Sequence, residues 1–127
     1  MTDCIFCDRI ASGDFFLEND KAVAFGDGFP LSDGHTLVVP RRHEADLFHL
    51  SRDERNAVWA LVEEVHAHLE VSLNPDGYNV GVNVGGAAGQ TVAHAHVHMI
   101  PRTAGDVDDP RGGVRWVLPT RAPWWGA

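Results

Sequence analysis

The feature that most constrains this chain is an alternation of histidines with apolar residues, His94-Ala95-His96-Val97-His98-Met99, followed by Ile100 and Pro101. Side chains of a β-strand point alternately to its two faces, so a strand over residues 92–100 predicts three imidazoles on one face, ~6.6–6.8 Å apart. Ala95, Val97 and Met99 would then lie in the core. Imidazoles gathered on one face suit metal binding, nucleophilic or acid–base catalysis, and phosphate binding. The alternative, an exposed strand that is rich in histidine by chance, fits poorly with the apolar opposite face and the glycine-rich segment before it.

The remaining pattern predicts an α+β domain. Residues 4–11 favour a short N-terminal helix that ends at Gly13, and Ser51 with Glu54 forms a capping box that begins one long helix over residues 51–73. Strands are expected at residues 15–18, 22–25, 35–39, 80–84, 92–100 and 114–118. Three strands, a helix and two further strands with short connections favour an antiparallel sheet of about five strands packed on the long helix.

Composition narrows the classes of protein. With 127 residues, the chain is expected to form a single domain over residues 1–127. Ten basic against eighteen acidic residues give a net charge of −8, which argues against nucleic acid as a partner. No apolar run approaches the ~18 residues that a membrane span needs. The first residues resemble no secretory signal, so a cytoplasmic location is expected.

The two cysteines, Cys4 and Cys7, form one C-x-x-C pair. In a reducing compartment this spacing is typical of a redox pair or of half a metal site. A redox pair normally follows a strand, and nothing strand-like precedes Cys4, so we favour a metal site completed by two further ligands. A metal-free pair of thiols is the alternative.

Together these segments resemble the histidine triad (HIT) superfamily of nucleotide hydrolases and transferases. Residues 94–100 match its His-φ-His-φ-His-φ-φ motif, where φ is apolar. The flanking residues 89–92 and 101–102, the segment 27–40 and the N-terminal Cys4-Ile5-Phe6-Cys7 agree as well. The resemblance covers about residues 3–102, and residues 103–127 are expected to form a C-terminal strand and an irregular tail.

The resemblance implies a reaction in which His96 attacks the α-phosphorus of a nucleotide and forms a covalent nucleotidyl-histidine, which water or another acceptor resolves. It assigns His98 to the α-phosphate and His35 to the support of the triad. Thr91 and Gly89 would approach the phosphate and the leaving group. Asn83 would help to hold the phosphates, and it is more typical of phosphoramidases than of dinucleoside polyphosphate hydrolases. Asp27 would bind the ribose hydroxyls.

The base pocket departs from the family pattern. Ile5, Phe6 and Phe25 remain as candidate base contacts, but Gly28 stands where a bulky aliphatic residue is usual and Arg9 where the helix often offers an apolar one. Apolar packing of this kind discriminates weakly between flat rings. We therefore expect stronger selection for ribose than for adenine.

A zinc-bearing subset of the superfamily implies one structural zinc ion bound by Cys4, Cys7, His43 and His94, and the family default implies a homodimer. Two arginines of the C-terminal segment, Arg111 and Arg115, are equally consistent with anion binding and with an ordinary surface turn. Trp124 and Trp125 are too apolar to be left in water. The competing functions are a nucleotide-binding module with little turnover and a zinc-organised interaction protein, and the latter leaves Asp27, Asn83 and Thr91 unexplained.

Overall fold

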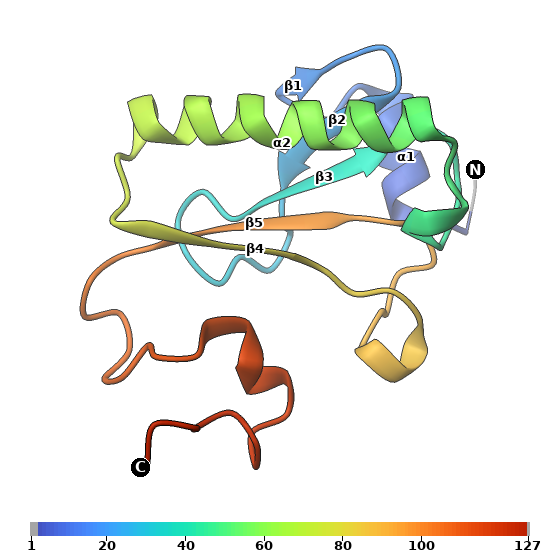
Figure 1. Cartoon of the computed structure of the whole chain (residues 1–127). Coiled ribbons are helices and arrows are strands. Elements are labelled where there is room, and N and C mark those ends of the chain that lie inside the picture. The colour runs from blue at the N-terminus through green and yellow to red at the C-terminus, as the bar shows by residue number, and fades with distance from the viewer. Residues whose placement is uncertain (1–2, 127) are drawn as a thin grey trace.

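A five-stranded antiparallel sheet organises residues 3–126, the part of the chain that the computed structural model describes (Figure 1). The strand order is β1-β2-β3-β5-β4. The strands are β1 (Leu17–Glu18), β2 (Ala22–Gly26), β3 (Thr36–Pro40), β4 (Gly77–Val82) and β5 (Val97–Arg102). The helices are α1 (Ile5–Ser12) and α2 (Arg52–Ser72). This arrangement confirms the predicted α+β class and sheet. Among residues 3–126, no helix combines the length and the apolarity needed to cross a bilayer.

Helix α2 covers one face of the sheet because its apolar residues recur at helical spacing. The capping box that begins it is present: the Glu54 N–H donates to Ser51 Oγ at 3.1 Å, and the Ser51 N–H donates to the Glu54 carboxylate at 2.9 Å. Val58, Leu61, Val62, Val65 and Leu69 are buried against Ala22, Ala24, Val38, Val97 and Met99 of the sheet. The alternate residues of β5, including His98, therefore lie on the opposite face.

Helix α1 packs on that opposite face. Its Phe6 is buried together with Val23, Phe25, Leu37 and Val39. The helix ends at Gly13, whose φ of 74° lies in the left-handed region that a glycine C-cap favours. This small second core places the N-terminal segment beside the histidines.

Gly34 sets the approach of the chain to His35. Its φ is +86°, and a Cβ atom at this position would lie 2.5 Å from Leu73 Cδ1. The positive φ favours glycine here, and a larger side chain would also have to displace the end of Leu73. His35 follows directly and is buried at the start of β3.

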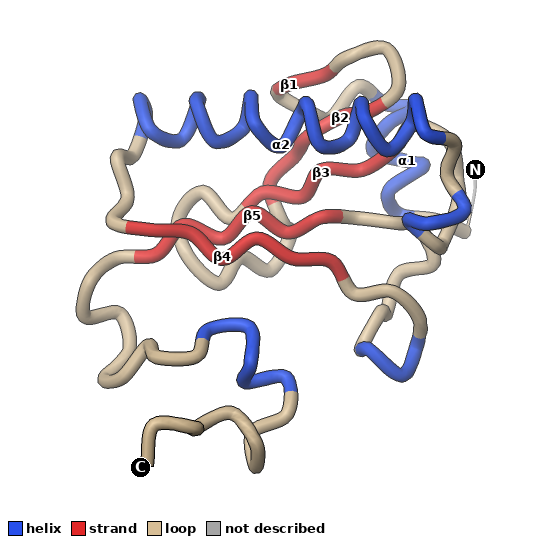
Figure 2. Tube along the Cα trace, in the orientation of Figure 1, coloured by secondary structure: helices blue, strands red, loops and turns tan. Residues whose placement is uncertain are grey.

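The predicted strand of the histidine motif is wrong in its extent. The predicted strand over residues 92–100 begins only at Val97, and Figure 2 draws the preceding segment as loop. Of the three triad histidines, only His98 lies in β5. Proline 40 ends β3, and the Ala95 N–H donates to the Glu44 carbonyl at 2.7 Å, outside the sheet. A flat row of three imidazoles along one strand is therefore not formed, although Ala95, Val97 and Met99 are buried as predicted.

The predicted strand over residues 114–118 is wrong: Gly113–Val117 forms a 3-10 helix. Gly112 and Gly113 have positive φ values, and the apolar side chains that follow them are exposed. This segment joins no strand of the described sheet, although β4 is an edge strand whose outer side is unpaired within residues 3–126. At the N-terminal end, the predicted strand 15–18 shortens to β1.

Candidate active site

His96 is held as one tautomer by the backbone of its own segment. Its Nδ1–H donates to the carbonyl oxygen of His94 at 2.8 Å. The ring is buried, and the edge of Phe6 lies against it with the ring centroids 5.1 Å apart. Since Nδ1 carries the proton, Nε2 has a free lone pair and is the nucleophilic nitrogen.

A relay of hydrogen bonds fixes His35 and His98 in the same way. The Leu31 N–H donates to His35 Nδ1 at 3.1 Å, so the proton of the neutral His35 ring is on Nε2. That Nε2–H donates to His98 Nδ1 at 3.0 Å. The proton of a neutral His98 ring is then on Nε2, which makes this atom a hydrogen-bond donor. The rings of His96 and His98 lie 5.1 Å apart, so a nucleophilic nitrogen stands beside a donor nitrogen.

Burial keeps these supporting rings neutral. It lowers the pKa of His35, and the nearby carboxylate of Asp27 opposes this shift only in part. It also lowers the pKa of His98, and the neighbouring rings of His96 and His35 add to the effect. Two neutral imidazoles at neutral pH preserve the donor and acceptor pattern described above.

Asp27 lies directly after β2, beside the relay. One carboxylate oxygen accepts the Phe29 N–H at 2.8 Å, and the other lies 3.4 Å from His35 Nε2. The side chain is therefore oriented before any ligand arrives.

Residues 85–89, here called the glycine loop, bring the predicted phosphate-contacting residues near the triad segment. Asn83 follows β4 and is half-buried, whereas Gly89 and Thr91 are exposed. The backbone N–H groups of Thr91, Val92 and Ala93 donate to no group of residues 3–126. Free amides of this kind are suited to an anion.

The predicted metal ligands converge from three segments. The Nδ1 atom of His94 lies 3.5 Å from Cys4 Sγ, 3.5 Å from Cys7 Sγ and 3.3 Å from His43 Nδ1. Cys7 Sγ lies 3.4 Å from His43 Nδ1. The other ring nitrogen of His94 donates to the Pro40 carbonyl at 2.8 Å. This contact leaves Nδ1 of the fully buried ring as the nitrogen available to a metal ion.

These distances fit a tetrahedral zinc ion. Zn–S bonds of about 2.3 Å and Zn–N bonds of about 2.0–2.1 Å at tetrahedral angles separate S from N by about 3.5 Å and N from N by about 3.3 Å. Two thiolates and two imidazoles give a closed site with no open position for water, the structural kind. Without a cation, burial and the neighbouring Cys4 raise the pKa of the Cys7 thiol to about 11.

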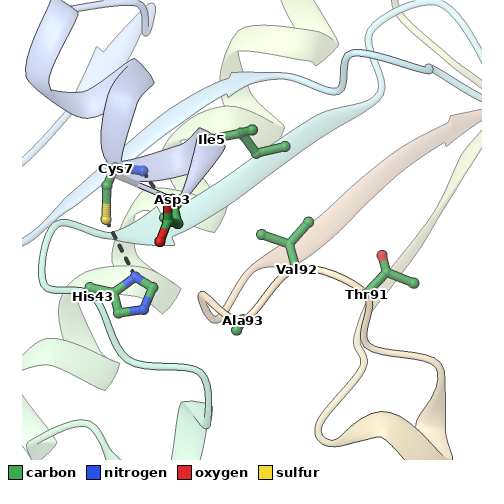
Figure 3. A pocket seen from close by; sticks show the side chains of 8 residues that line it. Asp3, Ile5, Cys7, His43, Thr91, Val92 and Ala93 are labelled. Atoms are coloured by element: carbon green, nitrogen blue, oxygen red, sulfur yellow. Dashed lines mark hydrogen bonds between the residues drawn. The ribbon is translucent and has the colours of Figure 1, made fainter. Parts of the chain in front are cut away.

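A cavity of about 640 Å³ adjoins this cluster (Figure 3). Cys7 and His43 lie on one side of it, and Thr91 and Val92 on another. Ile5 projects from α1 into the space between them. The cavity thus joins the cluster to the end of the glycine loop.

The three candidate base contacts differ in accessibility. Ile5 is 61% exposed, whereas Phe6 and Phe25 are only 5% and 1% exposed. The Arg9 guanidinium lies over the Phe25 ring, 4.0 Å from its centroid, and Phe6 packs against the same ring. Of the three, only Ile5 offers an accessible side chain, and the Arg9 guanidinium, which donates to the Gly26 carbonyl at 2.8 Å, covers the Phe25 ring.

The C-terminal segment, red in Figure 1, lies below β4 in that view. Arg111 pairs with Asp109 at 2.9 Å, and its guanidinium lies over the ring of Trp125. Arg115 donates to the carbonyl oxygens of Arg121 and Ala122. Both arginines are thus engaged within their own segment, while Trp124 is exposed.

Several functional contacts carry no sequence signal. Backbone groups set the tautomers of three rings: the His94 carbonyl that of His96, the Pro40 carbonyl that of His94, and the Leu31 amide that of His35. Carbonyls occur in every residue and amides in every residue but proline, so the sequence gives no sign of these contacts. Gln90 is different, because the sequence shows it only as a neighbour of the triad motif. In the structure its carboxamide makes three hydrogen bonds.

Comparison with known proteins shows the family of the chain. The HIT domain model matches residues 9–105. An uncharacterized HIT-like protein from Mycoplasma genitalium is 41% identical over 105 residues, which cover 80% of this chain and 74% of that one. An adenosine 5'-monophosphoramidase from Schizosaccharomyces pombe is 38% identical, with 78% of this chain and 74% of that one covered.

Two further relatives bear on the substrate and the metal. An adenylylsulfatase from Arabidopsis thaliana is 33% identical over 82% of this chain and 54% of its own. The crystal structure of a Zn-bound histidine triad family protein from Mycobacterium smegmatis superimposes with a TM-score of 0.72 at 35% identity, covering 82% of this chain and 78% of that one.

Proposed function

Because the chain belongs to the HIT family, we propose that it hydrolyses a nucleoside phosphate conjugate at the α-phosphate, with His96 as the nucleophile. The observation that carries the proposal is the hydrogen bond from His96 Nδ1–H to the His94 carbonyl, which leaves Nε2 free. The same carbonyl would stabilise the positive charge that the ring acquires in a covalent adduct.

The reaction would proceed in two displacements. His96 Nε2 forms a bond to the α-phosphorus, and the bond from phosphorus to the leaving group breaks; the leaving group takes the electron pair and picks up a proton from solvent. Water then attacks the phosphorus of nucleotidyl-His96 and loses a proton to solvent, while the P–N bond breaks, the imidazole is restored and the nucleoside monophosphate is released. His98 Nε2–H and the free amides of Thr91, Val92 and Ala93 would donate to the phosphate oxygens, whose charge builds up in each transition state.

The substrate we favour is an adenosine phosphoramidate. Two relatives are an adenosine 5'-monophosphoramidase and an adenylylsulfatase, and both names describe an adenylyl group joined to a small leaving group. Asn83 supports the same choice over a dinucleoside polyphosphate. Asp27, oriented by its bond from the Phe29 N–H, would accept hydrogen bonds from the ribose hydroxyls.

We also propose that Cys4, Cys7, His43 and His94 hold one zinc ion. The four donor separations and the Zn-bound relative from Mycobacterium smegmatis support this assignment. The ion would supply structural cross-linking, since four protein ligands leave no position for a substrate.

A homodimer and a cytoplasmic location complete the proposal. The family resemblance supports the dimer, and a scattering mass of twice 13.9 kDa in solution is the expected result. A reducing compartment suits a site that needs both thiols free.

The test is release of AMP from adenosine 5'-monophosphoramidate by the wild type, His96→Ala and His68→Ala. His68 is an exposed histidine of α2 and serves as the matched control. Loss of the nucleophile should lower kcat by at least about 10⁴-fold, whereas the control should stay within about 2-fold of the wild type. Equal rates for wild type and His96→Ala would rule out the nucleophile.

A nucleotide-binding module with little turnover is the second candidate, and the ligand-ready orientation of Asp27 would serve it equally well. Tight binding of AMP by a wild type that cleaves neither adenosine 5'-monophosphoramidate nor a dinucleoside polyphosphate would favour this candidate over the hydrolase.

A further inference from the structure

Gln90 closes the base of the glycine loop. The Gly85 N–H donates to Gln90 Oε1 at 2.8 Å, and the backbone N–H of Gln90 donates to the Gly85 carbonyl at 3.2 Å. Two hydrogen bonds therefore join residues 85 and 90, one on each side of the turn. Because the loop between them consists of exposed glycines and alanines, its conformation depends strongly on this closure.

The other end of the carboxamide anchors the loop to the body of the protein. Gln90 Nε2 donates to the Ala45 carbonyl at 2.8 Å and to the Val92 carbonyl at 3.0 Å. Both N–H groups and one acceptor position are thus used. If the amide were flipped, its oxygen would face the carbonyl oxygens of Ala45 and Val92, and its NH₂ group would face the Gly85 N–H. One orientation of the side chain is therefore strongly preferred.

The anchor point is shared with the nucleophile segment. Ala45 follows Glu44, whose carbonyl accepts the N–H of Ala95 at 2.7 Å, and Ala95 immediately precedes His96. Residues 44–45 thus hold the loop through Gln90 and the nucleophile through Ala95. Residues 44–45 therefore fix how far the amides that follow Gln90 lie from the His96 ring.

We propose that Gln90 is a positioning residue for the transfer reaction: it fixes the backbone of Thr91–Ala93 relative to His96. The inference rests on the proposed function, because it concerns the donors that meet the phosphate. A displacement of about 1 Å in a catalytic array can cost about 100-fold in rate. The carboxamide does not touch the reacting atoms, so its effect is exerted through the loop.

Gln90→Glu is the sharpest test because it changes only the donor end of the side chain. The carboxylate still accepts the Gly85 N–H, but it sets negative charge against the carbonyls of Ala45 and Val92. We expect kcat for adenosine 5'-monophosphoramidate to fall by about 30-fold or more, with KM within about 3-fold of the wild-type value.

The pH profile of this variant separates positioning from loss of fold. A protonated carboxyl group regains one O–H donor, which can again donate to the carbonyl of Ala45 or Val92. The ratio of the Gln90→Glu rate to the wild-type rate at the same pH should therefore rise as the pH falls towards the pKa of the new carboxyl group. A flat ratio would contradict a role for the donor.

Asn19→Asp is the matched control. The Asn19 carboxamide also clasps a turn with three hydrogen bonds, from Lys21 N–H and Ala22 N–H and to the Ala57 carbonyl. This turn joins β1 and β2, away from the triad. The control should lose stability without losing rate, and amide hydrogen exchange should quicken in residues 85–93 only in Gln90→Glu. A wild type that releases no AMP would refute the proposed function, whereas an active wild type and an equally active Gln90→Glu would overturn this inference alone.

Discussion

At the scale of single residues, the histidines of the site owe their tautomers to neighbouring backbone groups. The His94 carbonyl holds the Nδ1 proton of His96, and the Leu31 amide leaves the proton of His35 on Nε2. Each contact assigns one ring nitrogen as a donor and the other as a lone pair. The chemistry predicted for the histidines therefore requires neutral rings.

This requirement makes stability depend on pH. Burial lowers the pKa values of His35 and His98 below the value of about 6.5 that an unfolded chain shows. The unfolded state then binds more protons, so the stability is fully present above about pH 6.5 and is lost as the pH falls through the lowered pKa values. The free energy of unfolding should fall between about pH 7 and pH 5 by at most about 1.4 kcal/mol per pH unit for each such histidine.

His35→Gln tests this assignment, because glutamine retains an N–H donor for His98 Nδ1 and does not titrate. Urea unfolding of chelator-treated wild type and variant at both pH values gives the comparison. We expect the variant to lose less stability on acidification. Equal losses would show that His35 does not contribute.

At the scale of elements, α2 is the one that the sequence predicts best. Its capping box, its apolar stripe and its final turn are all local signals, and the structure reproduces them within a residue or two. For the triad segment, the sequence offers the candidate residues but does not predict their backbone geometry. Its bend at His94 depends on carbonyls of Pro40 and Glu44, which lie more than 40 positions away and have no residue-type signature.

Ser51→Ala tests the start of α2. The substitution removes the acceptor of the Glu54 N–H and should lower the free energy of unfolding by about 1 kcal/mol. AMP release at low temperature should not change, since the cap lies on the long helix and outside the triad segment. Unfolding in urea measures the first effect. A loss of rate larger than the loss of stability explains would contradict the assignment of Ser51 to the cap alone.

At the scale of the whole molecule, the proposed donors around the triad would allow a chain of net charge −8 to hold an anionic ligand. In the proposed site, His98 Nε2–H and the amides of residues 91–93 would meet the phosphate at contact range, where local dipoles outweigh distant charges. The sequence offers candidate residues for this site through short motifs. It could not predict their accessibility, because the burial of Phe25 depends on Arg9 from another element.

The Cys4–Cys7–His43–His94 cluster joins three segments that are distant in the sequence, and its loss should destabilise the whole fold. We expect about one zinc ion per chain by elemental analysis of protein prepared without chelator, in line with a closed four-ligand site. Cys7→Ser should lower the melting temperature more than it lowers turnover at low temperature. Zinc content well below one ion per chain would contradict the site.

The most direct test of the central claim is the mass of the protein during turnover. Wild type mixed rapidly with adenosine 5'-monophosphoramidate and quenched under denaturing, alkaline conditions should carry one adenylyl group, located by fragmentation on His96. The His98→Asn protein should carry the same group at the same ring, and His96→Ala should carry none. An adenylyl group on another residue, or AMP release by wild type with the group found equally in His96→Ala, would contradict the account.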